Sequence, residues 1–229
     1  MTLAAPPYLD FETVLARALG SLQGLRVLDM GAGRGDVTRR LAAAGADVTG
    51  VEPSREALDA ALQSGGGPSY VLAGAEATGL ASAAFDLVFF SKSLHHCPDM
   101  TAALVESIRL LRPAGRIAVL EPVSPDPFWP VMRHLDDESA VHAEAITAIE
   151  AQVAGGFCRR EAQLLFATKF RTESVDALVD LLLSVDPRRR LDAEGRAAME
   201  RAFAGACETD AVGRFIPHWL RLDVLRALA

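Results

Sequence analysis

The feature that most constrains this chain is the run VLDMGAGRGD from Val27 to Asp36, in which an apolar stretch leads into three glycines at alternate positions. Such a run predicts a buried strand that ends in a tight turn and opens a helix. Because glycine lets a ligand approach the main chain closely, we expect backbone amides of this turn to face a ligand. Asp29 lies beside the turn, where a carboxylate accepts hydrogen bonds or attracts a cation. An ordinary tight turn between a strand and a helix is the alternative interpretation.

Composition limits the classes of function that the chain can have. Half of the 229 residues are hydrophobic, 23% are charged, and the formal net charge is −7. This predicts a single domain over 1–229 and argues against nucleic-acid binding, since phosphate contacts need clustered cations. The three cysteines are far apart, so we predict neither a disulfide framework nor a metal site. Without a signal-peptide pattern or an apolar run of membrane-spanning length, we expect a cytoplasmic protein with a small-molecule partner and no membrane contact. The sequence does not specify an oligomeric state.

In the first half of the chain, short apolar runs alternate with segments of helical period. This alternation predicts a doubly wound, Rossmann-like α/β fold with a mostly parallel sheet, helices on both faces, and ligands at the carboxyl ends of the strands. The expected strands are 25–30, 46–51, 70–73, 85–90 and 116–120, and the expected helices include 11–19, one after Ser54 and 99–111.

The second half has a different pattern. We expect one long helix over about 131–153, a strand over 163–171, two further helices and a final strand around 220–224. In the final strand Arg221 and Asp223 alternate with apolar residues, which indicates a face half open to solvent. The segments at about 125–156 and 173–206 are expected to be helical and lid-like. The aromatic-rich stretch Phe128, Trp129, Met132 and His134 either lids a substrate or packs the long helix on the sheet.

The spacing of acidic residues narrows the choice of cofactor. Glu52 follows Gly31 by 21 residues, where an acid can bind both hydroxyls of a ribose. Both NAD and S-adenosylmethionine contain such a ribose. The alternative role for Glu52 is to cap the following helix. In a GxGxxG dinucleotide motif the third glycine would fall at Asp36, a poor neighbour for pyrophosphate. The chain also lacks a Tyr-x-x-x-Lys pair, which weakens the hypothesis that it is a dehydrogenase. It has no GxxxxGK loop, which excludes a P-loop protein.

Three segments together resemble one family. VLDMGAGRGDVTRRLAAAGADVTGVEPS, FDLVFFSKSLHHCPDM and LRPAGRIAVLEP are similar to class I S-adenosylmethionine-dependent methyltransferases, especially the small-molecule, methyltransferase type 11-like branch, over roughly Leu25 to Pro122. The resemblance implies a seven-stranded sheet with an antiparallel last strand and S-adenosyl-L-methionine as cofactor. It implies that the first motif binds the methionine and sugar portions, the acid after the second strand the ribose, and the loop after the third strand the adenine. The cofactor-binding residues carried over in this way are Asp29, Gly31, Ala32, Gly33, Gly35, Glu52, Pro53, Ala75 and Glu76.

The chain departs from that family at Gly74, where relatives usually place an aspartate that accepts from the adenine amino group. Glu76 is a candidate replacement, and the Ala75 amide could still donate to the ring. Loss of this hydrogen bond would weaken binding by roughly 1 kcal/mol.

Polar residues after the fourth expected strand are candidates for the reaction itself. Ser91 and its successors Lys92, Ser93 and Leu94 are expected to line the cofactor pocket. His95 and His96 are candidate general bases, because imidazole titrates near neutral pH, with a structural or substrate-wall role as the alternative.

The function expected from these observations is S-adenosylmethionine-dependent methyl transfer to a small-molecule acceptor. A non-catalytic S-adenosylmethionine-binding protein of the same fold is the first alternative, motivated by Gly74 and the absence of a clear base. A nucleotide-dependent oxidoreductase using NAD is the second.

Overall fold

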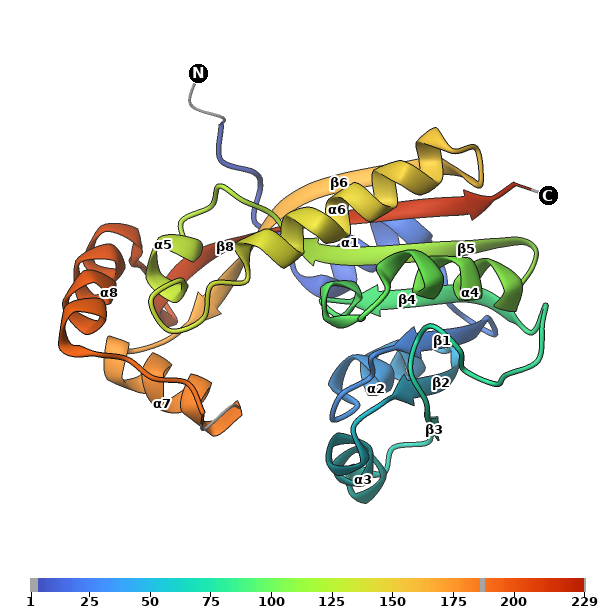
Figure 1. The fold of residues 1–229 in the computed structure, drawn as a ribbon, viewed down its shortest axis with the longest axis horizontal. Coiled ribbons are helices and arrows are strands. Elements are labelled where there is room, and N and C mark those ends of the chain that lie inside the picture. The colour runs from blue at the N-terminus through green and yellow to red at the C-terminus, as the bar shows by residue number, and fades with distance from the viewer. Residues whose placement is uncertain (1–3, 186–187, 229) are drawn as a thin grey trace. The chain divides into compact units, whose positions relative to one another are not determined.

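The computed structural model describes residues 4–228 apart from 186–187, and its helices and strands are drawn in Figure 1. It divides into two compact units. The larger unit holds Phe11–Glu121, Glu144–Leu164 and the chain from Arg221 onward; the smaller unit holds the chain up to Asp10, Pro122–Ala143 and Leu165–Leu220. A single methyltransferase domain with lid-like segments stays a prediction, and residues 186–187 of the second such segment lie outside the described residues.

The strands form one mixed sheet. They are β1 (Arg26–Met30), β2 (Asp47–Glu52), β3 (Ser69–Leu72), β4 (Phe85–Ser91), β5 (Leu111–Pro122), β6 (Cys158–Arg171), β7 (Glu208–Asp210) and β8 (Gly213–Ala227). Their order is β3-β2-β1-β4-β5-β8-β6, with the short β7 paired to β8 off this path. The first five strands pair in parallel, and β8 runs opposite to β5 (Figure 1). The mostly parallel sheet with seven strands on its path and an antiparallel last strand is thereby confirmed.

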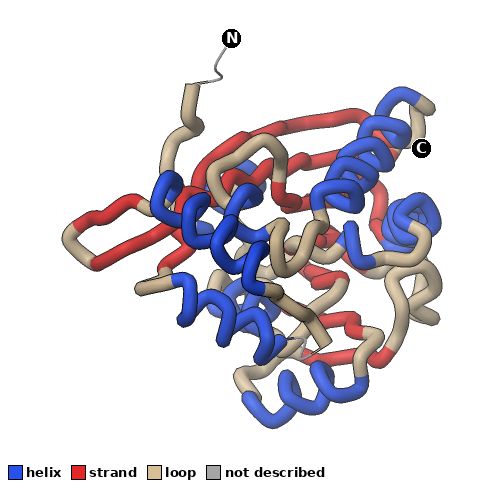
Figure 2. Tube along the Cα trace, turned by 60° about the vertical axis from the view of Figure 1, so that its left-hand side comes forward, coloured by secondary structure: helices blue, strands red, loops and turns tan. Residues whose placement is uncertain are grey.

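The helices follow the strands as expected in the first half of the chain. They are α1 (Phe11–Leu19), α2 (Asp36–Ala43), α3 (Arg55–Ser64), the short η1 (Leu94–His96), α4 (Met100–Leu110), α5 (Trp129–Met132), α6 (Ser139–Ala154), α7 (Val175–Val185) and α8 (Ala193–Ala206). Figure 2 shows them in blue around the red strands. Ser54 caps α3 and Asp99 caps α4 through side-chain oxygens that accept from backbone amides. Within the described residues no helix combines the length and apolarity needed to traverse a bilayer.

The central strands of the larger unit are buried on both faces, as a parallel sheet requires. On one face Leu28, Met30 and Val88 pack in a core that also contains residues of α4 and α6. The next residue of β4, Phe89, points to the other face, where its ring meets Phe11 of α1 at 6.1 Å between centroids. Helices therefore cover both faces, and the near-continuous apolar runs in the sequence have this physical cause.

The single helix expected over 131–153 is wrong. The chain forms α5, leaves the helical path at 133–138, and starts again as α6. Asp137 explains the restart, because its side chain accepts hydrogen bonds from the amide and hydroxyl of Ser139. Short acidic side chains compete in this way with helical backbone bonding. The helix does end before Gly155-Gly156, as expected.

The half-open face expected for the last strand is also wrong. The Asp223 side chain is fully buried and accepts from Arg160 at 2.8 Å, Gln163 at 3.0 Å and Arg221 at 2.6 Å. The strand lies between β5 and β6 rather than at an edge. Alternation of charged and apolar residues indicated exposure because the sequence alone does not show that buried charges have partners.

Asp126 organises the smaller unit. One carboxylate oxygen accepts from the amides of Phe128 and Trp129 at the start of α5, at 3.1 and 3.0 Å. The other accepts from the Trp219 amide at 2.9 Å and pairs with Nδ1 of His218 at 3.0 Å. Phe128, Trp129 and Met132 then pack in a core with α7, α8 and β8. These three residues therefore pack within the smaller unit, but against α7, α8 and β8; packing of the long helix on the sheet and a lid over a substrate both stay predictions.

Replacing Asp126 with alanine should lower the free energy of unfolding by about 3 kcal/mol, because several buried donors lose their acceptor together. Asp137→Ala is the matched control, since it removes an exposed helix-start carboxylate and should lower the same quantity by about 1 kcal/mol. Chemical denaturation measures both. Equal losses would show that Asp126 has no special part in the unit.

Candidate functional site

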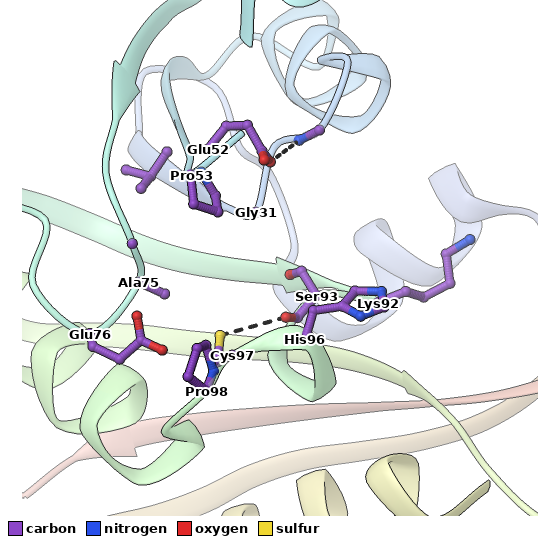
Figure 3. A pocket seen from close by; sticks show the side chains of 13 residues that line it. Gly31, Glu52, Pro53, Ala75, Glu76, Lys92, Ser93, His96, Cys97 and Pro98 are labelled. Carbon is purple, nitrogen blue, oxygen red and sulfur yellow. Dashed lines mark hydrogen bonds between the residues drawn. The ribbon is translucent and has the colours of Figure 1, made fainter. Parts of the chain in front are cut away.

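One cavity of about 610 Å³ lies at the carboxyl ends of the central strands in the larger unit. Figure 3 shows its wall, built from the turn after β1, the end of β2, the segment after β3 and the loop after β4. Of the residues expected to bind a cofactor, it is lined by Gly31, Gly33, Glu52, Pro53, Ala75 and Glu76. Segments far apart in the sequence thus meet at one edge of the sheet, where this class of fold places ligands.

Other expected residues are not in the cavity wall. Asp29 is buried behind it, and Ala32, Gly35 and Ser91 do not line it. Lys92 and Ser93 line it as expected, whereas Leu94 does not. The wall also contains residues that were not expected there: Val51, Gly74, Cys97 and Pro98. Position next to a strand end could have indicated most of them, whereas Pro98 and Cys97 reach the wall because η1 folds the chain back.

The glycine turn is shaped by close approach and by left-handed backbone angles. Gly31, Gly33 and Gly35 have φ values of 75°, 55° and 82°. A Cβ on Gly31 would lie 2.5 Å from the Cβ of Ser93, so this position admits no larger residue without movement. A side chain on Gly35 would instead collide with Tyr70 of β3, so Gly35 serves packing in this structure.

We expected the backbone amides of this turn to face a ligand, but they bind acceptors of the protein instead. Those of Gly31 and Ala32 donate to the Val51 carbonyl at 2.8 and 2.9 Å, and that of Gly35 donates to the Ala32 carbonyl at 2.9 Å. The Gly33 amide donates to Glu52 at 2.8 Å. Buried amides take the nearest acceptor, and here β2 supplies it. The turn therefore offers a ligand its shape and its neighbouring carboxylates.

Glu52 connects the turn to the next helix. Its Oε2 accepts from Gly33 and its Oε1 accepts from the Ser54 amide, each at 2.8 Å, and the residue is 8% exposed. Glu52 can therefore bind the start of α3 and a ligand at the same time, because each of its carboxylate oxygens has a second lone pair for a ligand hydroxyl.

Glu76 lies beside the position that distinguishes this chain from the family. A Cβ built on Gly74 would come within 2.9 Å of Oε2 of Glu76, and Oε1 of Glu76 accepts from the Asp99 amide at 3.3 Å. The carboxylate of Glu76 thus occupies the space next to the missing side chain. Figure 3 shows it directed toward Cys97 and Pro98 across the wall.

The loop after β4 is tightly fixed. Ser93 donates from its hydroxyl to the Met30 carbonyl at 2.5 Å. Lys92 has a left-handed φ of 56°, unusual for a residue with a side chain, and its amide donates to the Leu120 carbonyl at 2.7 Å. Burial lowers the pKa of Lys92, opposed by the nearby Glu121. Burial, with Glu76 and Glu121, raises the pKa of Cys97 to about 12, so its thiol stays protonated at neutral pH.

The two histidines occupy different positions. His96 lines the cavity, whereas His95 is buried and pairs through Nδ1 with Glu121 at 2.5 Å. Their ring centroids are 4.0 Å apart. A base role for either residue stays a prediction.

Asp29 is a buried carboxylate with incomplete pairing. Its Oδ2 accepts from the Thr38 hydroxyl at 2.6 Å, and its Oδ1 has no hydrogen-bond partner among the described residues. Burial raises its pKa to about 6, partly opposed by Thr38 and reinforced by Glu52. An acid held in this state destabilises the fold whenever it is ionised, which is typical of a group kept for binding.

Comparison with known proteins relates the segment that builds the cavity to methyltransferases. A family model described as a methyltransferase domain matches residues 28–119. The malonyl-[acyl-carrier protein] O-methyltransferase of Enterobacter lignolyticus is 34% identical over 122 residues, 50% of this chain and 49% of the relative. The ubiquinone biosynthesis O-methyltransferase of Aromatoleum aromaticum is 39% identical over 101 residues, 42% and 43% of the two chains. The chain thus spans about half the length, or less, of these curated relatives.

Solved structures share the fold over nearly the whole chain. An S-adenosylmethionine-dependent methyltransferase from Mesorhizobium loti aligns with a TM-score of 0.56 at 20% identity, covering 93% of this chain and 96% of that one. The [4+2]-cyclase SpnF aligns with a TM-score of 0.64 at 17% identity, covering 99% and 87%.

Asp29→Asn should raise the free energy of unfolding at pH 8, by up to about 3 kcal/mol, because the wild type must keep a buried carboxyl ionised above its raised pKa. The native state binds this proton more tightly than the unfolded chain does, so the gain should shrink as pH falls below about 6. Thermal and chemical unfolding at pH 5 and pH 8 measure it.

Asp86→Asn is the control, and it should change the free energy of unfolding in the opposite direction. Burial acts to raise the pKa of Asp86, but hydrogen bonds from Arg26 and Arg112 outweigh it and leave the pKa lowered. This variant should therefore lose stability at pH 8. Destabilisation of Asp29→Asn at pH 8 as well would contradict the strained-carboxylate interpretation.

The cavity, its glycine turn and its acidic residues all lie in the segment that the family model matches, and the fold agrees. Over residues 28–119 the chain is therefore similar to methyltransferase domains, and it shares its fold with a solved S-adenosylmethionine-dependent methyltransferase.

Proposed function

We propose that this protein transfers a methyl group from S-adenosyl-L-methionine to a small-molecule acceptor. The observation that carries the proposal is the cavity in which Gly31, Glu52 and Ala75 meet from the ends of three successive strands. These positions correspond to the parts of the family motif for the methionine and sugar, the ribose and the adenine.

The charges at the site fit a cationic cofactor. S-adenosylmethionine carries a sulfonium and an ammonium group, and the residues near or in the wall include the acids Asp29, Glu52 and Glu76. One oxygen of Asp29 has no hydrogen-bond partner among the described residues, as expected of a residue held for a ligand cation. The volume falls in the usual range for a cofactor pocket, roughly 300–1,000 Å³.

When bound, the cofactor supplies an electrophilic methyl group. The protein's residues then have to hold and orient it, and positioning is the main demand of an in-line displacement. Glu52 would accept from the ribose hydroxyls while it braces Gly33. Ser93 and Gly31, packed against each other, would fix the wall beside the methionine portion.

The alternative is binding without methyl transfer. The fold alone does not determine the reaction, since one structure that shares it is named a [4+2]-cyclase. Release of S-adenosylhomocysteine across varied acceptors separates the two functions. The relatives' names suggest the first acceptors to screen, malonyl thioesters and the phenols of ubiquinone biosynthesis.

Calorimetric titration with S-adenosylhomocysteine should show micromolar binding, and Glu52→Ala should weaken it at least tenfold, about 1.4 kcal/mol, through loss of a charge-assisted pair. Glu56→Ala, an exposed acid on the first turn of α3, is the control and should bind as the wild type does. NAD titrated in parallel should bind more weakly. Unchanged affinity in Glu52→Ala would remove this residue from the site, and preference for NAD would favour the oxidoreductase.

Glu76 should replace the family's aspartate at the adenine amino group. Glu76→Ala should then weaken the binding of S-adenosylhomocysteine. It should hardly change the binding of the inosine analogue, which has a carbonyl in place of the amino group. Adding Gly74→Asp to Glu76→Ala should restore the preference for adenine, because it returns a carboxylate to the same space. If Glu76→Ala weakens both ligands equally, Glu76 has no selective contact with the amino group.

A further inference from the structure

Lys92 is the only lysine or arginine among the described residues that line the cavity. The acids of the wall, Glu52 and Glu76, lie where the ribose and the adenine of the cofactor are proposed to bind. Figure 3 shows Ala75 and Glu76 on one side of the wall and the Lys92 side chain extending from the other. The wall is therefore acidic around the proposed nucleoside position and carries a cation at its far side.

The backbone of Lys92 is held in a conformation that does not require a lysine. Its φ is 56°, in the left-handed region, and its amide donates to the Leu120 carbonyl at 2.7 Å. Glycine adopts this conformation at little cost, whereas a long side chain is uncommon there. Strained positions of this kind cluster at ligand-binding sites. The strain therefore points to a role for the side chain.

The ammonium group of Lys92 has no hydrogen bond or ion pair within the described part of the chain. The residue is exposed, yet the protein atoms around it displace enough water to lower its pKa. Glu121 opposes this shift from nearby, but its own oxygens bind the Leu94 amide and the imidazole of His95. An anionic group of a ligand would supply the partner that the protein does not.

Neighbouring residues of this loop face different strands. The Ser93 hydroxyl donates to Met30 of β1, beside the glycine turn where the methionine portion of the cofactor is proposed to lie. The Lys92 amide binds β5 instead, and the charge that acts on its ammonium group is that of Glu121 at the end of the same strand. The cofactor and the Lys92 ammonium group thus belong to opposite sides of the loop, which leaves the acceptor as the source of the anion.

We propose that Lys92 is a specificity-determining residue whose ammonium group binds a carboxylate of the methyl acceptor. The inference rests on the proposed function and deepens it by naming the acceptor class, a small acid whose carboxylate is separate from the atom that is methylated. No bond to this carboxylate forms or breaks in the reaction. One ammonium group balances one negative charge, and Glu76 and Glu121 repel a second, so a carboxylate fits this position better than a phosphate dianion does.

The first test measures binding and needs no turnover. The full chain, saturated with S-adenosylhomocysteine, is titrated calorimetrically with 2-, 3- and 4-hydroxybenzoate and with the three matching hydroxybenzamides, which are neutral. At least one hydroxybenzoate should bind about tenfold more tightly than its amide, because a charge-assisted contact is worth more than a neutral one. Lys92→Met should abolish this preference, and Lys92→Arg should retain it.

Lys169→Met is the matched control, since it makes the same substitution at the other lysine of the chain. Lys169 lies in the smaller unit and pairs with Asp210 at 2.7 Å. This variant should keep the preference for the carboxylate. The proposal is overturned if none of the three pairs shows a preference, or if the preference survives in Lys92→Met.

The second test identifies which molecule supplies the carboxylate. Because the chain has two lysines, labelling with ε-¹³C-lysine gives two NMR signals, and Lys92→Arg assigns them. S-adenosylhomocysteine alone should shift the Lys92 signal little, and the preferred hydroxybenzoate should then shift it further, unlike its amide. If S-adenosylhomocysteine alone shifts the signal and the hydroxybenzoate adds nothing, the partner is the carboxylate of the cofactor and the proposal is refuted.

Binding of S-adenosylhomocysteine separates this proposal from the proposed function. Lys92→Met should bind it within about threefold of the wild type, which also shows that the variant is folded. A wild type that neither binds S-adenosylhomocysteine nor releases it from any acceptor would refute the proposed function. A wild type that binds it but does not distinguish hydroxybenzoates from hydroxybenzamides would leave methyl transfer standing and remove Lys92 from acceptor recognition.

Discussion

The site depends on the register in which β1 pairs with its two neighbours. Met30, the last residue of β1, lies opposite Val51 of β2 on one side and Phe90 of β4 on the other. All three strands therefore end at the same level, and their following residues meet in one place. The Val51 carbonyl then binds the Gly31 amide, and the Met30 carbonyl binds the Ser93 hydroxyl. A slip of one residue would turn the side chains of a strand to the opposite face and separate these groups.

Three acidic side chains are buried around this level, and each is held differently. Thr38 donates to Asp29, backbone amides donate to Glu52, and both amides and an imidazole bind Glu121. Removing carboxylates from water is unfavourable unless hydrogen bonds compensate. Asp29 is the least compensated of the three, because one of its oxygens has no partner in the part of the chain that the structure describes. The same low dielectric strengthens attraction to a cation. This unfavourable burial lowers the stability of the free protein, a cost that is common at functional sites.

Prediction from the sequence succeeded where a single physical requirement determines which residue types a segment contains. The strands β1 to β4 were predicted from apolar runs because a parallel sheet buries both faces, and the cavity was located because the glycine turn follows such a run. Prediction failed where partners distant in the chain decide the outcome. The amides of the turn bind Val51 and Glu52 instead of facing a ligand, and Asp223 is buried because Arg160 and Arg221 reach it. Glu121 directly follows the expected strand 116–120, but only the folded chain brings His95 to it.

The match to the methyltransferase family ends at residue 119, before Glu121 and before most of the smaller unit. A pattern common to a family can specify only what its members share, and methyltransferases share their donor. The cavity from Gly31 to Pro98 lies wholly within that match. Relatives differ in the acceptors that their names specify, so the acceptor must be distinguished by residues that the shared pattern leaves out. Glu121 is a buried carboxylate just beyond the match, and it contacts the imidazole of His95.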